Sequence, residues 1–253
     1  MHRHEDHIAY FIADLHLASS RPELCAAFFD LLPKIAEDAT DLFILGDFFN
    51  FWVGDDVLSP FTAKVAEELA KLSEQGINIY FQHGNRDFAV GKNYANLCKM
   101  TILPEVYTLP FAPEIVVLHG DQLCLADVKY QRYRKIIRNP LVLKCLHLLP
   151  KSVRLRISLR LREASKKAKR HTCIENQQCY CDVTNSAVEA MLIQHSADIM
   201  IHGHTHKPNI HEHHNGTRWV LSDWEQTGDY IKWNKANGLT RHTFTIPPVE
   251  SFS

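Results

Sequence analysis

Five short polar clusters in the sequence combine aspartate, histidine and asparagine in a way that suits metal binding. Each cluster directly follows a run of apolar residues, and none contains cysteine. The clusters are Ala13-Asp14-Leu15-His16, Gly46-Asp47, His83-Gly84-Asn85-Arg86-Asp87, His119-Gly120-Asp121 and His202-Gly203-His204-Thr205-His206. Carboxylate and amide oxygens mixed with imidazole nitrogens argue against a structural zinc site and favour Mn²⁺, with Fe²⁺, Co²⁺, Ni²⁺ or Zn²⁺ as substitutes.

Two divalent cations held by such residues would suit the hydrolysis of a phosphate ester. The negative charge of the ester repels hydroxide, and two cations about 3.5–4 Å apart both generate hydroxide and hold the phosphoryl oxygens. If Asp14 and His16 lie on a strand, their side chains share one face and can reach one cation. Asp47 could bridge both cations because a carboxylate has two oxygens. Glycine precedes three of the ligands, and we expect it to let the backbone come close to the metals.

Buried strands are predicted to carry these clusters. The apolar runs that indicate strands are Ile8 to Ile12, Leu42 to Leu45, Ile77 to Phe81, Ile115 to Leu118 and Ile199 to Ile201. Helices are predicted from Ser59-Pro60 to about Gly76 and from about Asn185 to His195. Alternating strands and helices indicate an α/β sheet, in which ligands gather at the carboxyl ends of the strands. We therefore expect the clusters to meet on one rim of the sheet, and the tail from Ile210 onward to add antiparallel strands.

The charge is distributed unevenly along the chain. Residues 129–170 hold 15 of the 28 Lys and Arg residues and one acid, Glu163, so this segment carries +14 and the remainder −15. The stretch from about 128 to 172 is also rich in leucine and helical in pattern. We predict one domain over residues 1–253 with this stretch as a helical insertion that caps the site. No apolar run approaches the roughly 18 residues of a membrane span, and the histidine-rich start of the chain is not typical of a signal sequence.

In their order, the clusters resemble the signature of the calcineurin-like metallophosphoesterases: D-x-H, G-D, G-N-[HR]-D, H and G-H-x-H. The resemblance covers most of the chain and implies an α/β fold with a two-sheet β-sandwich core flanked by helices. It also implies two divalent metal ions, with Asp47 as the bridge. The implied metal ligands are Asp14, His16, Asp47, Asn85, His119, His204 and His206. The implied catalytic residues are Asp47, Asn85, Arg86 and His119. Asp87 could orient a ligand histidine.

Arg86 narrows the expected chemistry. Many members of that superfamily have a histidine at this position, which is usually held to protonate the leaving group. Arginine cannot act as a general acid near pH 7, but its guanidinium suits an anionic phosphate. A leaving group that is itself a phosphate needs little protonation. The substitution therefore indicates hydrolysis of a pyrophosphate bond.

Longer stretches around the clusters are similar to the UDP-2,3-diacylglucosamine hydrolases. The similar stretches are Phe11 to Leu17, Ile44 to Asp47, Trp52 to Asp56, His83 to Phe88 and Ile201 to Pro208. Enzymes of that family cleave the pyrophosphate bond of a UDP-linked diacyl sugar to 2,3-diacylglucosamine 1-phosphate (lipid X) and UMP, in lipid A synthesis. The resemblance implies Mn²⁺ as the cofactor and action at the cytoplasmic face of the inner membrane, as a peripheral protein. The implied substrate contacts are Asn85, Arg86, Asp127, Ser165, Lys169, Thr172 and His204.

The predicted insertion agrees with a lipid substrate. Leu141-Val142-Leu143, Leu146 to Leu149 and the leucines up to Leu161 offer apolar surface for acyl chains, and the arginines among them offer cations for anionic headgroups. The leucines are too dense for a solvated helix face, and no aromatic stacking platform for nucleic acid is evident. We expect a monomer without a nucleic-acid partner.

Other functions stay open at this point. The chain could be a phosphoesterase for a soluble nucleotide such as a dinucleoside polyphosphate, a non-catalytic scaffold on this fold, or a nucleic-acid-binding module with a basic insertion. The histidines outside the five clusters are expected on the solvated surface rather than in a second metal site. They are His2, His4, His7, His211, His213 and His214.

Overall fold

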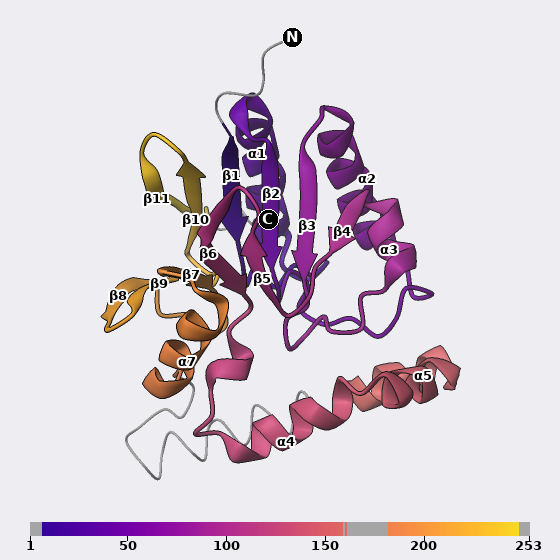
Figure 1. Cartoon of the computed structure of the whole chain (residues 1–253). Coiled ribbons are helices and arrows are strands. Elements are labelled where there is room, and N and C mark those ends of the chain that lie inside the picture. The colour runs from indigo at the N-terminus through magenta and orange to yellow at the C-terminus, as the bar shows by residue number, and fades with distance from the viewer. Residues whose placement is uncertain (1–6, 159, 161–181, 248–253) are drawn as a thin grey trace.

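Two stacked β-sheets form the centre of the structure, a computed structural model that describes residues 7–158, 160 and 182–247 (Figure 1). The first sheet has six strands in the order β11-β10-β1-β2-β3-β4, and the second has five in the order β5-β6-β7-β9-β8. The strands are β1 (Ile8–Ile12), β2 (Asp41–Leu45), β3 (Asn78–Gln82), β4 (Met100–Ile102), β5 (Val106–Leu109), β6 (Ala112–Leu118), β7 (Ile199–His202), β8 (Asn209–His213), β9 (Gly216–Val220), β10 (Thr227–Asn234) and β11 (Gly238–Thr245).

An apolar layer fills the space between the sheets. The rings of Phe11 and Phe43, from the first sheet, stack with their centroids 5.0 Å apart, and they share one buried cluster with Val117 and Ile201 of the second sheet. Parallel strands that are covered on both faces need apolar residues at successive positions. For this reason β2 is buried along its whole length. The five strands predicted from apolar runs are confirmed as β1, β2, β3, β6 and β7.

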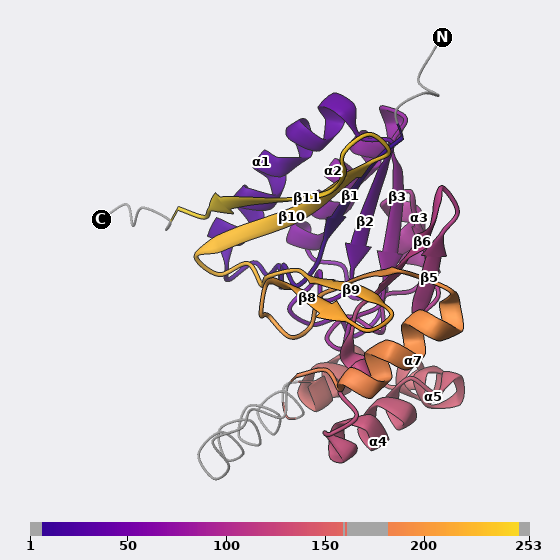
Figure 2. The ribbon, with the colours of Figure 1, turned by 60° about the vertical axis from the view of Figure 1, so that its left-hand side comes forward.

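Helices cover the outer faces of both sheets (Figures 1 and 2). The helices α1 (Pro22–Asp38), α2 (Pro60–Glu74) and α3 (Lys92–Leu97) pack on the first sheet, and α7 (Asn185–His195) packs on the second. Helix α2 begins where the sequence predicts, because Ser59 and Thr62 form a capping box in which each side chain accepts the backbone N–H of the other. The bounds predicted for α7 are also confirmed.

The tail of the chain contributes to both sheets. Strands β8 and β9 form an antiparallel hairpin in the second sheet, and β10 and β11 form another in the first. The predicted antiparallel strands are confirmed, but β9 also runs parallel to β7. The prediction that one sheet carries all five polar clusters is wrong, since β1, β2 and β3 belong to the first sheet and β6 and β7 to the second. An apolar run indicates that a strand is buried, but it does not indicate which sheet the strand joins.

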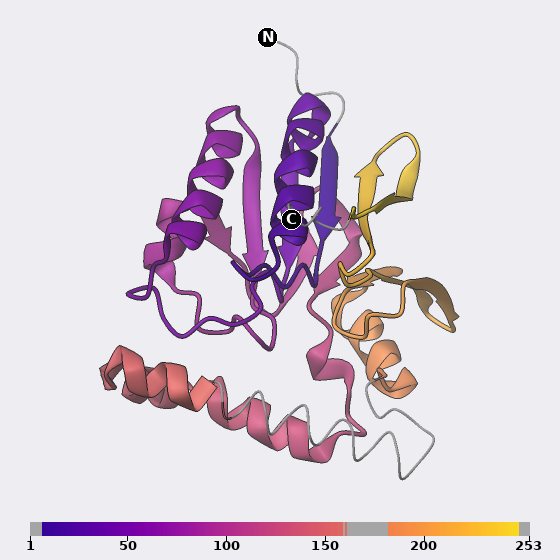
Figure 3. The same cartoon turned by 180° about the vertical axis from the view of Figure 1, so that it is seen from behind.

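The predicted insertion lies across the carboxyl ends of the strands (Figures 1 and 3). Its described part comprises α4 (Val128–Ile137), α5 (Pro140–Leu148) and further helical residues at 151–158, whereas residues 161–172 of the prediction lie outside the described residues. The short helix η1 (Asp121–Leu123) leads into it. Where the chain returns to the core, the backbone N–H of Thr184 donates to the carbonyl of Leu123 at 2.9 Å. Among the helices that are described, none is both long and apolar enough to cross a bilayer.

Candidate metal centre

The loops after β1, β2, β3, β6 and β7 meet at one end of the two sheets. Backbone hydrogen bonds tie the first two loops together, since the N–H groups of Asp14 and His16 donate to the carbonyls of Gly46 and Asp47 at 3.1 and 2.9 Å. The backbone N–H of Gly203, after β7, donates in turn to the carbonyl of His119, after β6, at 3.0 Å. The structure therefore brings together all seven side chains that the sequence proposes as metal ligands.

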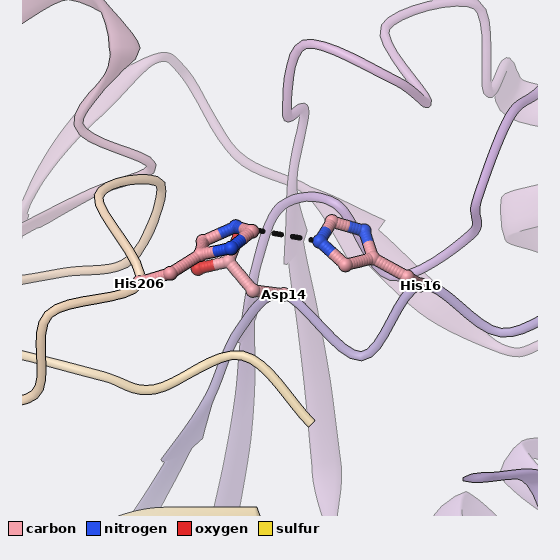
Figure 4. Close-up of side chains that lie close together, drawn as sticks. All are labelled: Asp14, His16 and His206. Carbon is pink, nitrogen blue, oxygen red and sulfur yellow. Dashed lines mark hydrogen bonds and ion pairs between the residues drawn. The ribbon is translucent and has the colours of Figure 1, made fainter. Parts of the chain in front are cut away.

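One group of ligands consists of Asp14, His16 and His206, whose side chains point toward one another (Figure 4). The Nε2 atoms of His16 and His206 lie 3.4 Å apart, and Nε2 of His206 lies 3.4 Å from Oδ1 of Asp14. Asp47 borders this group, with its Oδ2 atom 3.9 Å from Nδ1 of His16. These atoms are close enough together to surround a single cation.

A second group forms around the amide of Asn85. Its Oδ1 atom lies 3.2 Å from Nε2 of His119 and 2.9 Å from Nδ1 of His204. Oδ1 of Asp47 lies 3.7 Å from the same nitrogen of His119. Asp47 thus presents one carboxylate oxygen to each group, which is the geometry that a bridging ligand requires.

Two buried atoms in the first group fit a metal better than any described protein partner. Oδ1 of Asp14 and Nδ1 of His16 are both buried and make no hydrogen bond within the described residues. Leaving such atoms unsatisfied costs about 1–3 kcal/mol each, and a cation would satisfy them. Carboxylate, amide and imidazole ligands together suit Mn²⁺, Fe²⁺ or Zn²⁺, so the residues present fit two divalent metal ions.

Five of the seven ligands adopt the left-handed backbone conformation. The φ angles are 55° for Asp14, 51° for His16, 50° for Asp47, 68° for His204 and 55° for His206. The expectation that Asp14 and His16 share one face of a strand is wrong, because β1 ends at Ile12 and both residues follow it. Their side chains converge through this tight turn instead. Each such residue costs about 1–2 kcal/mol, and strain of this kind concentrates at functional sites.

Two glycines leave room for carboxylates of neighbouring loops, as the sequence predicts. A Cβ atom on Gly84 would lie 2.2 Å from both the backbone nitrogen and Oδ1 of Asp47. A Cβ atom on Gly203 would lie 2.2 Å from Oδ2 of Asp14. Neither approach is possible for a residue with a side chain, so each glycine permits the close contact between two loops that carry ligands.

Hydrogen bonds behind the ligands fix their orientation. Nδ1 of His119 donates to the carbonyl of Leu45 at 2.9 Å, which leaves Nε2 directed at the second group. Nδ1 of His206 lies 3.1 Å from Oδ2 of Asp223. Burial lowers the pKa of His206, but the neighbouring carboxylates of Asp14 and Asp223 outweigh it and raise that pKa to about 10. Partners of this kind orient a ligand ring and increase its basicity.

Asp223 is not among the residues predicted from the sequence, although a signal for it exists. It follows β9 by three residues and lies at the same end of the sheet as the other clusters. The rule that predicts the ligands, a polar residue just after a buried strand, applies to it as well. Its cluster, Ser222-Asp223, lacks the histidine and glycine that made the other five conspicuous.

Asp87 does not orient a histidine, contrary to the prediction. Its buried carboxylate accepts the backbone N–H groups of Asp47, Phe48 and Phe49 at 2.7–3.3 Å and that of Gly84 at 2.8 Å. It therefore holds the loop after β2 against the loop after β3. The backbone N–H groups of the two loops occupy this buried carboxylate, so it is not available to orient a ligand ring.

Arg86 lies beside the bridging carboxylate. Its Nε atom is 3.3 Å from Oδ2 of Asp47, and its Nη1 atom donates to Oδ1 of Asn50 at 3.0 Å. The side chain is partly exposed at the edge of the two ligand groups. A guanidinium in this place could contact an anion that is held by the metals.

The remaining predicted substrate contacts are placed only in part. Asp127 caps α4, where its carboxylate accepts the backbone N–H of Tyr130 at 2.9 Å, and the ring of Tyr130 stacks on that of His204 with centroids 6.1 Å apart. Asp127 is thus within one helical turn of a residue that contacts a ligand. Ser165, Lys169 and Thr172 lie outside the described residues.

Of the six histidines expected at the solvated surface, His2 and His4 lie outside the described residues, and His213 is not solvated as expected. The side chain of His213 is buried, and its Nε2 atom accepts a hydrogen bond at 3.2 Å from Nε of Arg218, which is itself buried. Arg218 also contacts Nε2 of His202 at 3.2 Å. The alternating histidines of β8 indicate a surface strand. The sequence does not show that Arg218 of the neighbouring strand β9 contacts His213.

Comparison with known proteins agrees with the geometry of the site. The calcineurin-like phosphoesterase family matches residues 9–208. The UDP-2,3-diacylglucosamine hydrolase of Tolumonas auensis is 42% identical over 88% of this chain and 91% of its own length. That of Shewanella loihica is 44% identical over 88% and 90%, and that of Histophilus somni 129Pt is 42% identical over 91% and 97%. Among solved structures, an archaeal phosphodiesterase covers 94% of this chain with 11% identity and a TM-score of 0.47, too distant to bear on function. The chain belongs to the calcineurin-like phosphoesterases and, among them, to the family of the UDP-2,3-diacylglucosamine hydrolases.

Proposed function

We propose that this protein hydrolyses the pyrophosphate bond of UDP-2,3-diacylglucosamine to 2,3-diacylglucosamine 1-phosphate and UMP, a step of lipid A synthesis. The observation that carries the proposal is the pair of ligand groups that share Asp47, with Arg86 beside them. Relatives named for this substrate, more than 40% identical over nearly the whole chain, support it.

We infer the roles of the residues from their places in the site. Asp14, His16 and His206 would hold one cation, Asn85, His119 and His204 the other, and Asp47 would bridge them. When bound, two divalent cations supply positive charge to the phosphoryl oxygens and a nucleophile at neutral pH. Arg86 would bind the pyrophosphate through its guanidinium. Because the departing group is a sugar phosphate, it leaves without a proton from the protein.

Mn²⁺ is the metal that we propose for both sites. The ligands are four imidazoles, two carboxylates and one amide oxygen, which is a set without the thiolates that favour zinc in structural sites. A carboxylate bridge and an amide oxygen are hard ligands, and they suit Mn²⁺ well. Titration of the metal-free protein with Mn²⁺, Zn²⁺ and Fe²⁺, followed by measurement of turnover, would rank the three ions.

The described part of the insertion presents apolar residues to solvent. Leu141 is 73% exposed and Leu148 is 80% exposed, and Ile136 is also exposed. We propose that this surface takes the acyl chains, and that Asp127, Ser165, Lys169 and Thr172 add polar contacts to the substrate. We further propose that the protein acts as a monomer at the cytoplasmic face of the inner membrane, bound peripherally through basic residues and leucines of the insertion.

A single assay tests the reaction. Purified protein with Mn²⁺ should release UMP from UDP-2,3-diacylglucosamine, and a chelator should abolish the release. Asp47→Ala should abolish turnover while circular dichroism shows an intact fold, because the variant loses the bridge between the two groups. UMP formation no greater than in the chelator-treated control would overturn the proposal. Faster turnover of a dinucleoside polyphosphate than of the lipid would favour a soluble nucleotide as substrate.

A second experiment tests the acyl surface. The double variant Leu141→Ser, Leu148→Ser should raise KM for the lipid at least tenfold, since full burial of even one leucine side chain is worth about 1.5–3 kcal/mol. It should leave turnover of a water-soluble phosphodiester unchanged. Leu97→Ser is a matched control, because Leu97 is likewise exposed but lies on α3. Equal losses on both substrates would contradict acyl binding by the insertion.

A further inference from the structure

An arginine of the insertion is buried in a contact with the core. Arg154 lies in the helical residues 151–158, and its side chain is only 5% exposed. Its Nη1 atom donates to the carbonyl of Val53 at 2.6 Å and to Oδ1 of Asp56 at 2.8 Å, and its Nη2 atom donates to Oδ2 of Asp56. Its Nε atom donates to the carbonyl of Leu149 at 3.1 Å. The guanidinium therefore joins residues 151–158, the far end of the described part of the insertion, to the loop at residues 50–56.

The other side of the same loop holds Arg86. The backbone N–H of Trp52 donates to the carbonyl of Arg86 at 3.0 Å, and Oδ1 of Asn50 accepts from its guanidinium at 3.0 Å. Trp52 and Val53 are consecutive, so one peptide links the backbone of Arg86 to the guanidinium of Arg154. A shift of the loop at Val53 would be passed on to Arg86 at Trp52.

The loop between these contacts is stiff. The indole N–H of Trp52 donates to Oδ1 of Asp55 at 3.0 Å, and the ring of Trp52 packs against those of Phe49 and Tyr94, with centroids 4.8 and 4.4 Å away. Asp55 also accepts the backbone N–H groups of Gly91 and Tyr94 at 2.9 and 3.0 Å. A segment held at so many points moves as a unit rather than absorbing a displacement.

The near end of the insertion, at α4, is held more firmly than the far end at residues 151–158. At the near end, the fully buried carboxylate of Asp121 accepts from Tyr130, Arg134 and Arg138 at 2.6, 2.8 and 3.0 Å. At the far end, Asp56 is 49% exposed, and water screens its pairing with Arg154. The far contact is therefore the one that can open at low cost.

We propose that Asp56 and Arg154 form a positioning pair for Arg86. When this pair is formed, the insertion contacts the loop at residues 50–56, and the loop holds Arg86 in its place in the metal site. The effect of this pair on catalysis rests on the proposed function, in which Arg86 binds the pyrophosphate. The contact itself does not depend on that function. The insertion then acts on the reaction twice, through its own surface and through Arg86.

A double-mutant cycle on turnover tests the link to Arg86. Arg154→Gln should lower kcat on the lipid about tenfold, since a small misplacement of a substrate-holding group is that costly, and Asp56→Asn should do the same. In an Arg86→Ala background, Arg154→Gln should cause no further loss of kcat. Arg154→Lys should retain part of the activity, because it keeps the charge but loses the fork. If Arg154→Gln lowers kcat equally in the wild-type and Arg86→Ala backgrounds, the proposal is overturned.

Hydrogen exchange tests the contact without any substrate. In Arg154→Gln, the amides of residues 50–56 and of α5 should exchange at least tenfold faster, while those of α7 stay unchanged. Arg156→Gln is a matched control, because it removes one exposed basic residue two positions away and should leave exchange at residues 50–56 unaltered. Unchanged exchange in Arg154→Gln would refute the positioning pair. If Arg154→Gln speeds exchange at residues 50–56 but the unsubstituted protein does not hydrolyse the lipid, the proposed function is refuted and the positioning pair still stands.

Discussion

At the scale of single residues, the proposed ligand His206 is held between two carboxylates. Oδ1 of Asp14 faces the ring on the metal side, and Oδ2 of Asp223 faces it from behind at 3.1 Å. The contact with Asp223 fixes the ring rotation and leaves Nε2 directed at His16 and Asp14. Asp223 is therefore expected to matter for metal binding without touching the metal.

Asp223→Asn should weaken the affinity of the first site for Mn²⁺ about 10- to 100-fold, the usual effect of removing a carboxylate behind a ligand histidine. Isothermal titration of the metal-free protein with Mn²⁺ measures the change directly. Asp198→Asn is a suitable control, because Asp198 is an exposed aspartate just before β7 and remote in role from His206. An affinity equal to that of the control would show that the contact with Asp223 does not support the ligand.

The sequence predicts which side chains gather at the site better than it predicts how the backbone brings them together. All seven follow buried strands, and strand runs are readable from apolar residues such as those of β2. The left-handed turns at Asp14 and His16 are not readable, because a non-glycine residue adopts that conformation only when the surrounding structure imposes it. The hydrogen bonds of Asp87 were equally hidden, since they depend on two loops that only the fold brings together.

At the scale of elements, α4 is anchored by two acids that share the same pair of arginines. Asp121 is fully buried and accepts from Arg134 and Arg138, whereas Glu105 is 47% exposed and pairs with both at 2.8 and 2.6 Å. Arg138 also donates to the carbonyl of Gly84 at 3.0 Å, next to the ligand Asn85. The root of the insertion is thus joined to the loop after β3.

Asp121→Asn should lower the free energy of unfolding by about 3 kcal/mol, because it leaves two largely buried guanidinium groups with only the half-exposed Glu105 as a charged partner. Glu105→Gln should cost less than about 1 kcal/mol, since water screens the exposed carboxylate. Urea denaturation of both variants with Mn²⁺ present gives the comparison. Similar losses in the two variants would mean that burial does not decide the strength of this anchor.

The elements themselves were largely predictable, and their assembly was not. Apolar runs predicted five strands, and the Ser59-Pro60 signal predicted the start of α2. Strands β4 and β5 are three and four residues long, too short to give a clear periodic pattern. The division of the strands between two sheets depends on side chains such as Phe11 and Val117 meeting across the interior. Local sequence carries no direct record of such contacts.

At the scale of the whole molecule, metal ions bound at the candidate site should stabilise the contact between the two sheets. The proposed ligands of this site come from loops of the first sheet, such as Asp47 and Asn85, and from loops of the second, such as His119 and His204. Ions bound there would hold the sheets together at one end. Stability should therefore depend on the metal, and not only on the apolar layer.

Mn²⁺ at 100 times its dissociation constant should stabilise the fold by about 2.7 kcal/mol, which corresponds to a rise in Tm of roughly 5–10 °C for a chain of this size. Differential scanning calorimetry with and without EDTA measures the shift. In Asp47→Ala the shift should shrink to almost nothing, because the variant lacks the ligand common to both groups. A full shift in that variant would place the stabilising ion elsewhere.

The hydrogen bond between Thr184 and Leu123 means that the insertion leaves and rejoins the core at a single point. The two sheets are complete on either side of that point, with β6 before it and α7 and β7 after it. None of the seven proposed metal ligands lies in the stretch between Leu123 and Thr184. The proposed metal ligands and the proposed acyl surface are thus encoded in separate stretches of one chain, and the contact of Arg154 with Asp56 is one place where the two stretches meet.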